Sequence, residues 1–143
     1  MNIKVNLDRE KIVKKVESDK FGLLVSNEWK RLIDKYTPRD TGNLMQNVTK
    51  KPFALHYKVP YAHYMYMGEV YVDPQLQVGG FFSPTYGWFS RPNVKKIPSG
   101  RTFNYSKSKN PFATDHWDVV AAQSGQREKL YRTLNAALRS GKF

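Results

Sequence analysis

The alternation of apolar and polar residues divides the chain into a helical first part, an extended middle part and a helical last part. In residues 8–36, apolar side chains recur at the spacing of a helix. They are Ile12, Val13, Val16, Val25, Trp29, Leu32, Ile33 and Tyr36. Asp8 suits the N-cap position, Gly22 is a point where the helix can break in two, and Pro38 places the end of the helix near Tyr36.

The middle of the chain begins with the pattern of a half-buried strand. Residues 52–59 alternate strictly, with Phe53, Leu55, Tyr57 and Val59 on one side and more polar residues on the other. This period of two is typical of a strand that has one buried and one wet face. We therefore predict a strand here.

The next stretch, YAHYMYMGEVYV, fits two periodicities. Tyr61, Tyr64 and Met65 share one face if the stretch is helical, whereas Ala62, Tyr64 and Tyr66 share one face if it is extended. Because periodicity alone does not choose, we favour a short helical turn followed by a strand over residues 69–72.

Residues 73–111 contain most of the glycines and prolines, which predicts repeated turns or a long excursion instead of long regular elements. The stretch is nevertheless rich in aromatic residues, namely Phe81, Phe82, Tyr86, Trp88, Phe89, Phe103 and Tyr105. Side chains of this kind are too apolar to stay in water, so we expect the excursion to pack on its own domain or on a neighbour.

The last segment has the pattern of an amphipathic helix or a broken pair of helices. Its apolar positions are Trp117, Val120, Ala121, Leu130, Leu134 and Leu138. Thr114 or Asp115 would cap its start, Gly125 marks a kink and Gly141 follows its end. Together the segments predict an α+β fold: an N-terminal helix, a small antiparallel sheet with a long aromatic and basic loop over about 73–111, and a C-terminal amphipathic helix.

The composition fits a single domain over residues 1–143. Of these residues, 40% are hydrophobic and 14% aromatic, which is enough for one core of ordinary size but not for two. The absence of cysteine excludes disulfides and thiolate metal sites. No apolar run reaches the length of a signal peptide or of a membrane-spanning helix, so we expect neither secretion by that route nor a membrane location.

The charge is strongly positive and unevenly distributed. The formal net charge is +12, which favours an anionic partner. No acidic residue lies between Asp73 and Asp115. This acid-free stretch contains six basic residues, which are Arg91, Lys95, Lys96, Arg101, Lys107 and Lys109.

Residues 40–42, Asp-Thr-Gly, form the tripeptide that carries the catalytic carboxylate in aspartic proteases of the retroviral kind. Such a site needs two carboxylates about 3 Å apart that share one proton, on a loop that follows a buried apolar strand. Here the preceding residues are polar, charged and interrupted by proline, and Arg39 would stabilise the ionised form. We therefore interpret Asp40 or Thr41 as the cap of a short helix over residues 42–48.

Other catalytic and metal-binding patterns are weak. The only histidines are His56, His63 and His116, and the metal-site candidates among them are His63 with Glu69 and His116 with Asp115 and Asp118. Surface or interface histidines explain these residues better. No glycine-rich phosphate loop is present, and sequence spacing gives neither Ser83 nor Ser99 a histidine partner. We therefore expect no enzyme, no metal and no cofactor.

Aromatic and basic residues alternate in residues 86–91 and again in residues 103–107. This pattern fits a platform on which single-stranded nucleic acid stacks. We favour a second interpretation, in which the rings fill a core or a subunit contact and the cations lie at its rim.

Four stretches between residues 36 and 118 occur in a recognisable order, namely TPRDTGNL, VPYAHYMYMGEVYVDP, GGFFSPTYGWFSRPNV and KNPFATDHW. Together they resemble the minor capsid proteins that tailed phages of Gram-positive bacteria encode in their head-to-tail region. These proteins are relatives of the tail-completion and head-tail connector proteins of long-tailed phages. The segments YAHYMYMG, WFSRP and ATDHW are the specific ones, whereas the PxDTGxL pattern is shared by many relatives. In that family the tripeptide has no catalytic role.

The resemblance implies a non-enzymatic virion protein of the phage neck, assembled in the cytoplasm of the bacterial host. It implies a homo-oligomeric ring, expected to be hexameric, in a stopper or tail-completion role. One side of the ring would meet the portal, adaptor or stopper protein and the other the tail terminator or tail tube. A ring around a DNA channel needs positive charge that contacts phosphate without reading bases, and the six basic residues of the acid-free stretch are candidates. Candidate subunit-interface aromatics are Tyr61, Tyr64, Tyr66, Phe81, Phe82, Trp88 and Phe89.

Two other hypotheses stay open at this point. A soluble nucleic-acid-binding module would use the basic aromatic loop to grip DNA or RNA, and its monomer would bind tightly with a steep dependence on salt. An enzyme is the third hypothesis, with the aspartic protease as its only named form. Replacing Asp40 by asparagine tests this hypothesis, and we expect assembly to stay largely intact and no proteolysis to be lost.

Overall fold

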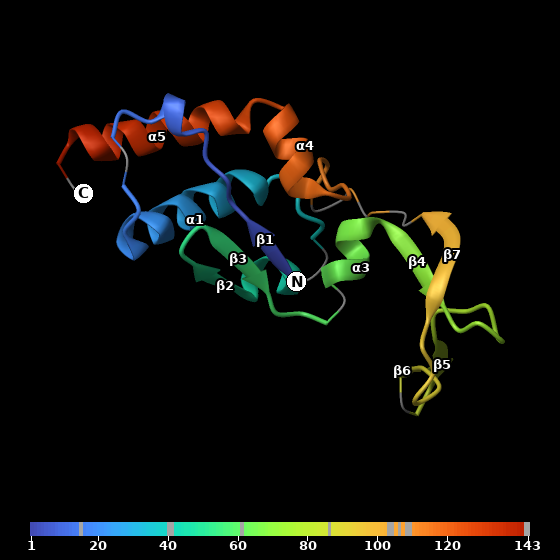
Figure 1. Cartoon of the computed structure of the whole chain (residues 1–143). Coiled ribbons are helices and arrows are strands. Elements are labelled where there is room, and N and C mark those ends of the chain that lie inside the picture. Colours follow the sequence, from blue (N-terminus) through green and yellow to red (C-terminus); the bar gives the residue numbers. More distant parts are fainter. Residues whose placement is uncertain are drawn as a thin grey trace.

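A computed structural model of the chain describes residues 1–14, 16–39, 42–60, 62–85, 87–102, 105, 107 and 110–141, without the side chains of residues 81–83 and 87–89. Figure 1 shows a body, in which helices pack on a small sheet, and an arm of β-strands that projects from this body. The elements in chain order are β1 Asn2–Lys4, η1 Arg9–Lys11, α1 Asp19–Ile33, α2 Asn43–Gln46, β2 Val48–Lys51, β3 Ala54–Tyr57, α3 Ala62–Met67, β4 Glu69–Val72, β5 Phe81–Ser83, β6 Gly87–Phe89, β7 Ile97–Thr102, α4 Trp117–Gln123 and α5 Gln126–Arg139. The predicted α+β class, with a small antiparallel sheet and a helix near each end, is confirmed.

The first helix is shorter than predicted and begins later. Asp8 does cap a helical turn, because its Oδ1 accepts a hydrogen bond from the backbone N of Glu10 at 3.1 Å, but this turn is the three-residue η1. The long helix α1 begins after Ser18, whose hydroxyl accepts from the backbone N of Phe21 at 3.2 Å. The prediction of a helix that starts at residue 8 is therefore wrong.

Gly22 does not break the helix, contrary to the sequence-based expectation, but serves close packing inside α1. A Cβ atom at this position would lie 2.8 Å from the ring of Phe53 and from the Cβ of Pro52. The backbone N of Phe53 donates to the carbonyl of Gly22 at 3.1 Å. The turn between β2 and β3 therefore rests directly on the helix backbone, which only glycine allows.

The body contains a three-stranded antiparallel sheet in the order β1-β3-β2. Ile3 pairs with Leu55, and Val48 pairs with Tyr57. The strand predicted over 52–59 is present as the shorter β3, and its predicted inner face is buried at Leu55, Tyr57 and Val59, whereas Phe53 lies in the preceding turn with φ 55°. Ser26 of α1 fastens the sheet, since its hydroxyl donates to the carbonyl of Lys51 at 2.5 Å and accepts from the backbone N of Ala54 at 3.0 Å.

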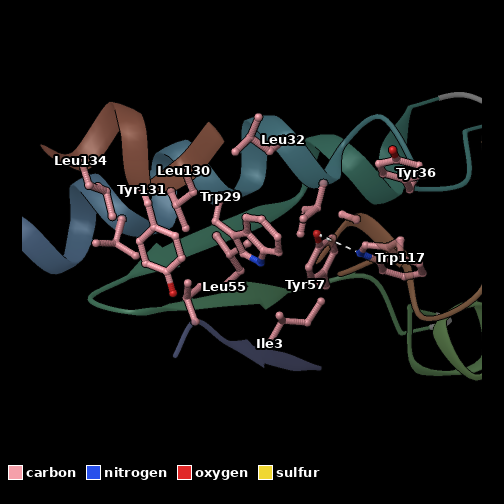
Figure 2. Close-up of a cluster of buried hydrophobic side chains, with 14 of the residues drawn as sticks. Ile3, Trp29, Leu32, Tyr36, Leu55, Tyr57, Trp117, Leu130, Tyr131 and Leu134 are labelled. Atoms are coloured by element: carbon pink, nitrogen blue, oxygen red, sulfur yellow. Dashed lines mark hydrogen bonds between the residues drawn. The ribbon is translucent and has the colours of Figure 1, made fainter. Parts of the chain in front are cut away.

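The core lies between one face of this sheet and the helices. Figure 2 shows Trp29 of α1 and Leu130 of α5 among the side chains around Leu55. The indole Nε1 of Trp117, at the start of α4, donates to the hydroxyl of Tyr57 at 3.2 Å. In Figure 1, α1 lies between the sheet and α5, and the opposite face of the sheet is left uncovered.

The C-terminal helical region is broken as predicted but capped differently. Gly125, with φ 85°, separates α4 from α5, and Gly141, with φ 79°, follows the end of α5. The expected caps Thr114 and Asp115 are wrong, because His116 takes the N-cap position with φ 41°. The backbone N of Thr114 donates instead to the carbonyl of Tyr36 at 3.1 Å, so this segment fastens the end of α1.

The region around the Asp-Thr-Gly tripeptide folds into a short helix, α2, which is shorter than the predicted 42–48. Gly42 occupies its N-cap position with φ 87°. The predicted capping residues Asp40 and Thr41 lie outside the described residues. Farther along, the favoured order of a helical turn and then a strand is confirmed by α3 and β4.

Candidate functional site: the basic β arm

The predicted excursion is a ribbon of paired strands, which we call the arm and define as residues 69–102. Antiparallel pairing joins β4 to β7, with Glu69 opposite Thr102 and Val72 opposite Ile97. Farther out, β5 pairs with β6. Figure 1 shows the arm leaving the body beside α3 and extending away from the helices. Pairing therefore gives part of the backbone of this Gly- and Pro-rich segment its hydrogen-bond partners.

A bulge bends the β4–β7 ribbon. The register shifts between Glu69 and Tyr71, and Gly100 opposite has φ 78°, a conformation that favours glycine. The hydroxyl of Ser99 donates to the carbonyl of Val70 at 2.5 Å and accepts from the backbone N of Arg101 at 3.1 Å. A bulge of this kind increases the local twist of a strand pair and re-aims the chain beyond it.

An ion pair in the middle of the arm joins Asp73 to Arg91. The Nε and Nη2 atoms of Arg91 donate to the two carboxylate oxygens of Asp73 at 2.5 and 2.7 Å. The backbone N atoms of Gln75 and Leu76 donate to Asp73 Oδ1 at 2.9 and 3.2 Å. The guanidinium of Arg91 is the main reason why the pKa of Asp73 lies well below its usual range. Asp73 is 4% exposed, so the pair fixes the turn that follows β4.

Three other predicted cations donate to backbone carbonyls of the chain. The Nζ of Lys96 donates to the carbonyl of Gly79, and that of Lys107 to the carbonyl of Ala113. The Nη2 of Arg101 donates to the carbonyl of Gln77 at 3.4 Å. The structure thus brings Arg91, Lys95, Lys96 and Arg101 together on the arm and places Lys107 next to the body instead.

Lys95 differs from these cations. It is exposed, and its ammonium group makes no hydrogen bond or ion pair with any residue that the structure describes. Lys109, the sixth cation predicted to face DNA or a partner, lies outside the described residues. Lys95 is therefore the described arm cation that is most available to a partner.

The predicted interface aromatics divide into three groups. Tyr64 is 37% exposed, and its ring centroid lies 4.6 Å from that of Tyr71 on β4. Tyr66 serves the chain's own packing, since its hydroxyl donates to Asp118 Oδ1 at 2.6 Å and its ring lies edge-on to Trp117. Burial, followed by the bond to Asp118, raises the pKa of Tyr66. The third group lies outside the described residues and consists of Tyr61 and the side chains of Phe81, Phe82, Trp88 and Phe89.

Sequence reasoning missed a set of exposed aliphatic side chains on and beside the arm. Leu76 is 44% exposed, Val78 38%, Ile97 41% and, next to the arm on α3, Met67 42%. The signal was present in the short segment DPQLQV, where two aliphatic residues stand among turn residues with no periodic partner. These residues are neither aromatic nor basic, so the patterns that predicted an interface did not include them.

The candidate metal ligands do not form a cluster. His116 Nδ1 lies 3.1 Å from Asp115 Oδ1, but Asp118 is engaged with Tyr66. The ring of His63 packs beside Tyr64 with centroids 5.8 Å apart. Among the residues described, no three His, Cys, Asp or Glu side chains are close enough to hold a metal ion.

Within the described residues, no helix combines the length and the apolar character that crossing a bilayer requires. No protein-family model, no curated protein and no solved structure matches the chain.

Proposed function

We propose that the chain is a structural protein of the virion neck of a tailed phage, one subunit of a ring around the DNA channel. The ring is hexameric in this proposal and lies between the portal or adaptor and the tail terminator or tail tube. The observation that supports it most is the arm, which projects from a body whose core is complete and which exposes aliphatic side chains. The arm would be the element that docks on neighbouring subunits.

The arm suits docking because it offers two features that a partner can contact, exposed apolar side chains and free strand edges. Leu76, Val78 and Ile97 expose apolar area that a partner would bury. Among the described strands, β4 and β7 pair only with each other, so each has a free edge to which another chain can add. A contact between the arm of one subunit and a different surface of the next is heterologous, and such contacts produce closed rings when the rotation closes.

The alternative, a soluble module that grips nucleic acid with the arm, receives less support from the geometry. Asp73 neutralises Arg91, and Lys96 and Arg101 donate to carbonyls of the arm itself. Phosphate binding by these side chains would compete with bonds that hold the arm together. The same cations fit better as part of the internal scaffold of a docking element.

The docking role can be tested by changing the exposed aliphatic residues alone. Leu76→Ser combined with Ile97→Thr removes apolar area that is accessible in the free chain, so the free energy of unfolding should change by less than about 0.5 kcal/mol per site. Each side chain that a neighbour buries contributes about 1.5–3 kcal/mol, so the yield of joined heads and tails should fall more than about tenfold. Particle titre and electron microscopy of necks measure this yield.

The matched control is Leu23→Ser combined with Val13→Thr, which changes equally exposed aliphatic residues on the body. This control should assemble like the unaltered chain. Equal assembly of the arm variant and the control would contradict the docking role. An image of the virion with the labelled chain away from the neck would contradict the proposed function itself.

A further inference from the structure

The uncovered face of the β1-β3-β2 sheet is a second surface of uniform charge. Strand pairing places Asn2, His56 and Thr49 in one row across the sheet, and Lys4, Ala54 and Lys51 in the next. Alternation puts these side chains on the face opposite to the buried residues Ile3, Leu55 and Tyr57. Lys58 continues the same face one step beyond His56. The open face therefore carries Asn2, Lys4, Thr49, Lys51, Ala54, His56 and Lys58.

The residues of this face are positive or neutral, and Asp118 lines a pocket beside Asn2 and Lys4 at its β1 edge. Lys4, Lys51 and Lys58 are exposed, and their ammonium groups make no hydrogen bond or ion pair with the described part of the chain. The helical side of the body is different, because several of its basic residues pair with acidic ones. These pairs include Arg9–Glu17, Lys11–Glu128, Lys30–Asp34 and Arg31–Glu28. Around Lys51 and Lys58, counter-ions must come from solvent or from a ligand.

We infer that the open sheet face binds the phosphate backbone of double-stranded DNA without reading its sequence. The inference rests on the proposed function, which places the chain next to DNA. It assigns the DNA contact to the body instead of the arm. Lysine, asparagine and threonine side chains are ordinary donors to phosphate oxygens, and all three occur on this face. Binding would release counter-ions from the DNA and gain free energy at low salt.

The spacing of the lysines suits a duplex. Lys4 on β1 and Lys51 on β2 are two strand spacings apart, which is about 10 Å between backbones. The grooves of B-DNA are about 6 and 12 Å wide, so long lysine side chains at this separation reach phosphates on both sides of one groove. Lys58 extends the cationic surface along β3.

The composition of the face argues against other anionic partners. Single strands bind on platforms of aromatic rings, and the open face has no Phe, Tyr or Trp. Membrane surfaces are bound by apolar side chains that enter the lipid, and the only aliphatic residue on the face is Ala54. Charged residues also protect sheets against aggregation, but either sign serves that purpose, whereas this face carries only positive charge.

The test measures the affinity of the full chain for a mixed-sequence duplex of about 20 base pairs, two turns of B-DNA, at salt concentrations from about 25 to 200 mM. The sheet variant is Lys4→Gln, Lys51→Gln and Lys58→Gln. The matched control is Lys129→Gln, Arg132→Gln and Arg139→Gln, which removes the same number of charges from exposed positions of α5. Thermal unfolding of both variants checks that each remains folded.

Loss of three phosphate contacts should flatten the slope of log affinity against log salt by about 2.7, and weaken binding at 50 mM salt by more than about tenfold. The α5 control should keep most of the slope. Equal losses in both variants would overturn the inference, because binding would then follow total charge. Tighter binding to single strands, or to vesicles that contain phosphatidylserine, would overturn it in favour of those partners.

The outcome for this surface can be separated from the outcome for the neck. If the sheet variant loses duplex binding while the labelled chain lies away from the neck of the virion, DNA binding by the open sheet face is supported and the proposed neck function is contradicted. If rings join heads and tails but the sheet variant binds duplex as the unaltered chain does, the neck function stands and the surface fails.

Discussion

At the residue scale, the pair of Asp73 and Arg91 changes how the charge of the chain is understood. Counting along the sequence, Arg91 is one of six cations in an acid-free stretch, and Asp73 is merely the residue where that stretch begins. In the fold, the turn after Asp73 directs two backbone N–H groups to its carboxylate. Arg91, which follows β6, donates to the same carboxylate. The sequence does not reveal this partnership because it depends on the path of the arm.

The pair predicts how the arm responds to acid. Since Arg91 lowers the pKa of Asp73 in the folded arm, this carboxylate stabilises the turn above its ordinary pKa of 3.8, and the stabilisation is lost as the pH falls through the folded value. Arg91→Lys keeps the charge but loses the bidentate contact, so the pH midpoint at which Asp73 is protonated should move upward toward 3.8. The amide NMR shifts of Gln75 and Leu76 against pH measure the midpoint.

Arg101→Lys is the control for this measurement, because Arg101 donates to Gln77 and does not touch Asp73. The midpoint should stay at its original position in that variant. A midpoint at or above the ordinary value in the unaltered chain would show that the pair does not form in solution.

At the element scale, the sequence predicted those elements whose pattern is local. The alternation around β3, the order of α3 and β4 and the break at Gly125 are all written in neighbouring residues, and all three are confirmed. The start of α1 was missed because the apolar residues before it, of which Ile12 is buried, belong to a segment that packs on α5 without being a long helix. The backbone N of Asp8 donates to the hydroxyl of Tyr131 at 2.8 Å, and that of Val13 to Asn135 Oδ1 at 2.9 Å. Bonds to α5 replace the bonds of a helix.

The contact between α1 and the β2–β3 turn predicts an effect opposite to helix propensity. Gly22→Ala should improve the helix by about 1 kcal/mol but place a methyl group 2.8 Å from the Phe53 ring and Pro52. Overpacking of this kind costs about 1–3 kcal/mol, and a shift of the turn would also strain the hydrogen bond from Phe53 to Gly22. We expect a net loss of about 1 kcal/mol in denaturant unfolding.

Asn27→Ala is the matched control, since Asn27 is exposed on the same helix. This change should leave stability unaltered or raise it by about 0.5 kcal/mol. A Gly22→Ala chain as stable as the Asn27→Ala chain would mean that the turn can move away from the helix without cost.

At the scale of the whole molecule, body and arm have different kinds of stability. The body buries large side chains such as Phe21, Leu55 and Trp117, whereas the arm is held by strand pairing and the pair of Asp73 and Arg91. The candidate surfaces could not be predicted from the sequence, because they depend on pairing between distant parts of the chain. The open sheet face exists only because β1 pairs with a strand more than fifty residues later in the chain.

This division predicts two levels of protection in hydrogen exchange. Leu134→Ala empties a fully buried position on α5 and should lower the protection of α1 and β3 amides by about 2–5 kcal/mol. Amides of the β4–β7 ribbon should keep their own lower protection, because local opening already governs their exchange. A parallel loss of protection in the ribbon would show that body and arm unfold as one unit.

The bonds that tie residues 8–13 to α5 have a consequence for the order of events in the cell. Asp8, Lys11 and Val13 bond to Tyr131 and Asn135, which are translated more than 120 residues later. The arm, made in between, emerges before the body can close. A polypeptide cut short before α5 thus lacks a finished body to carry its arm.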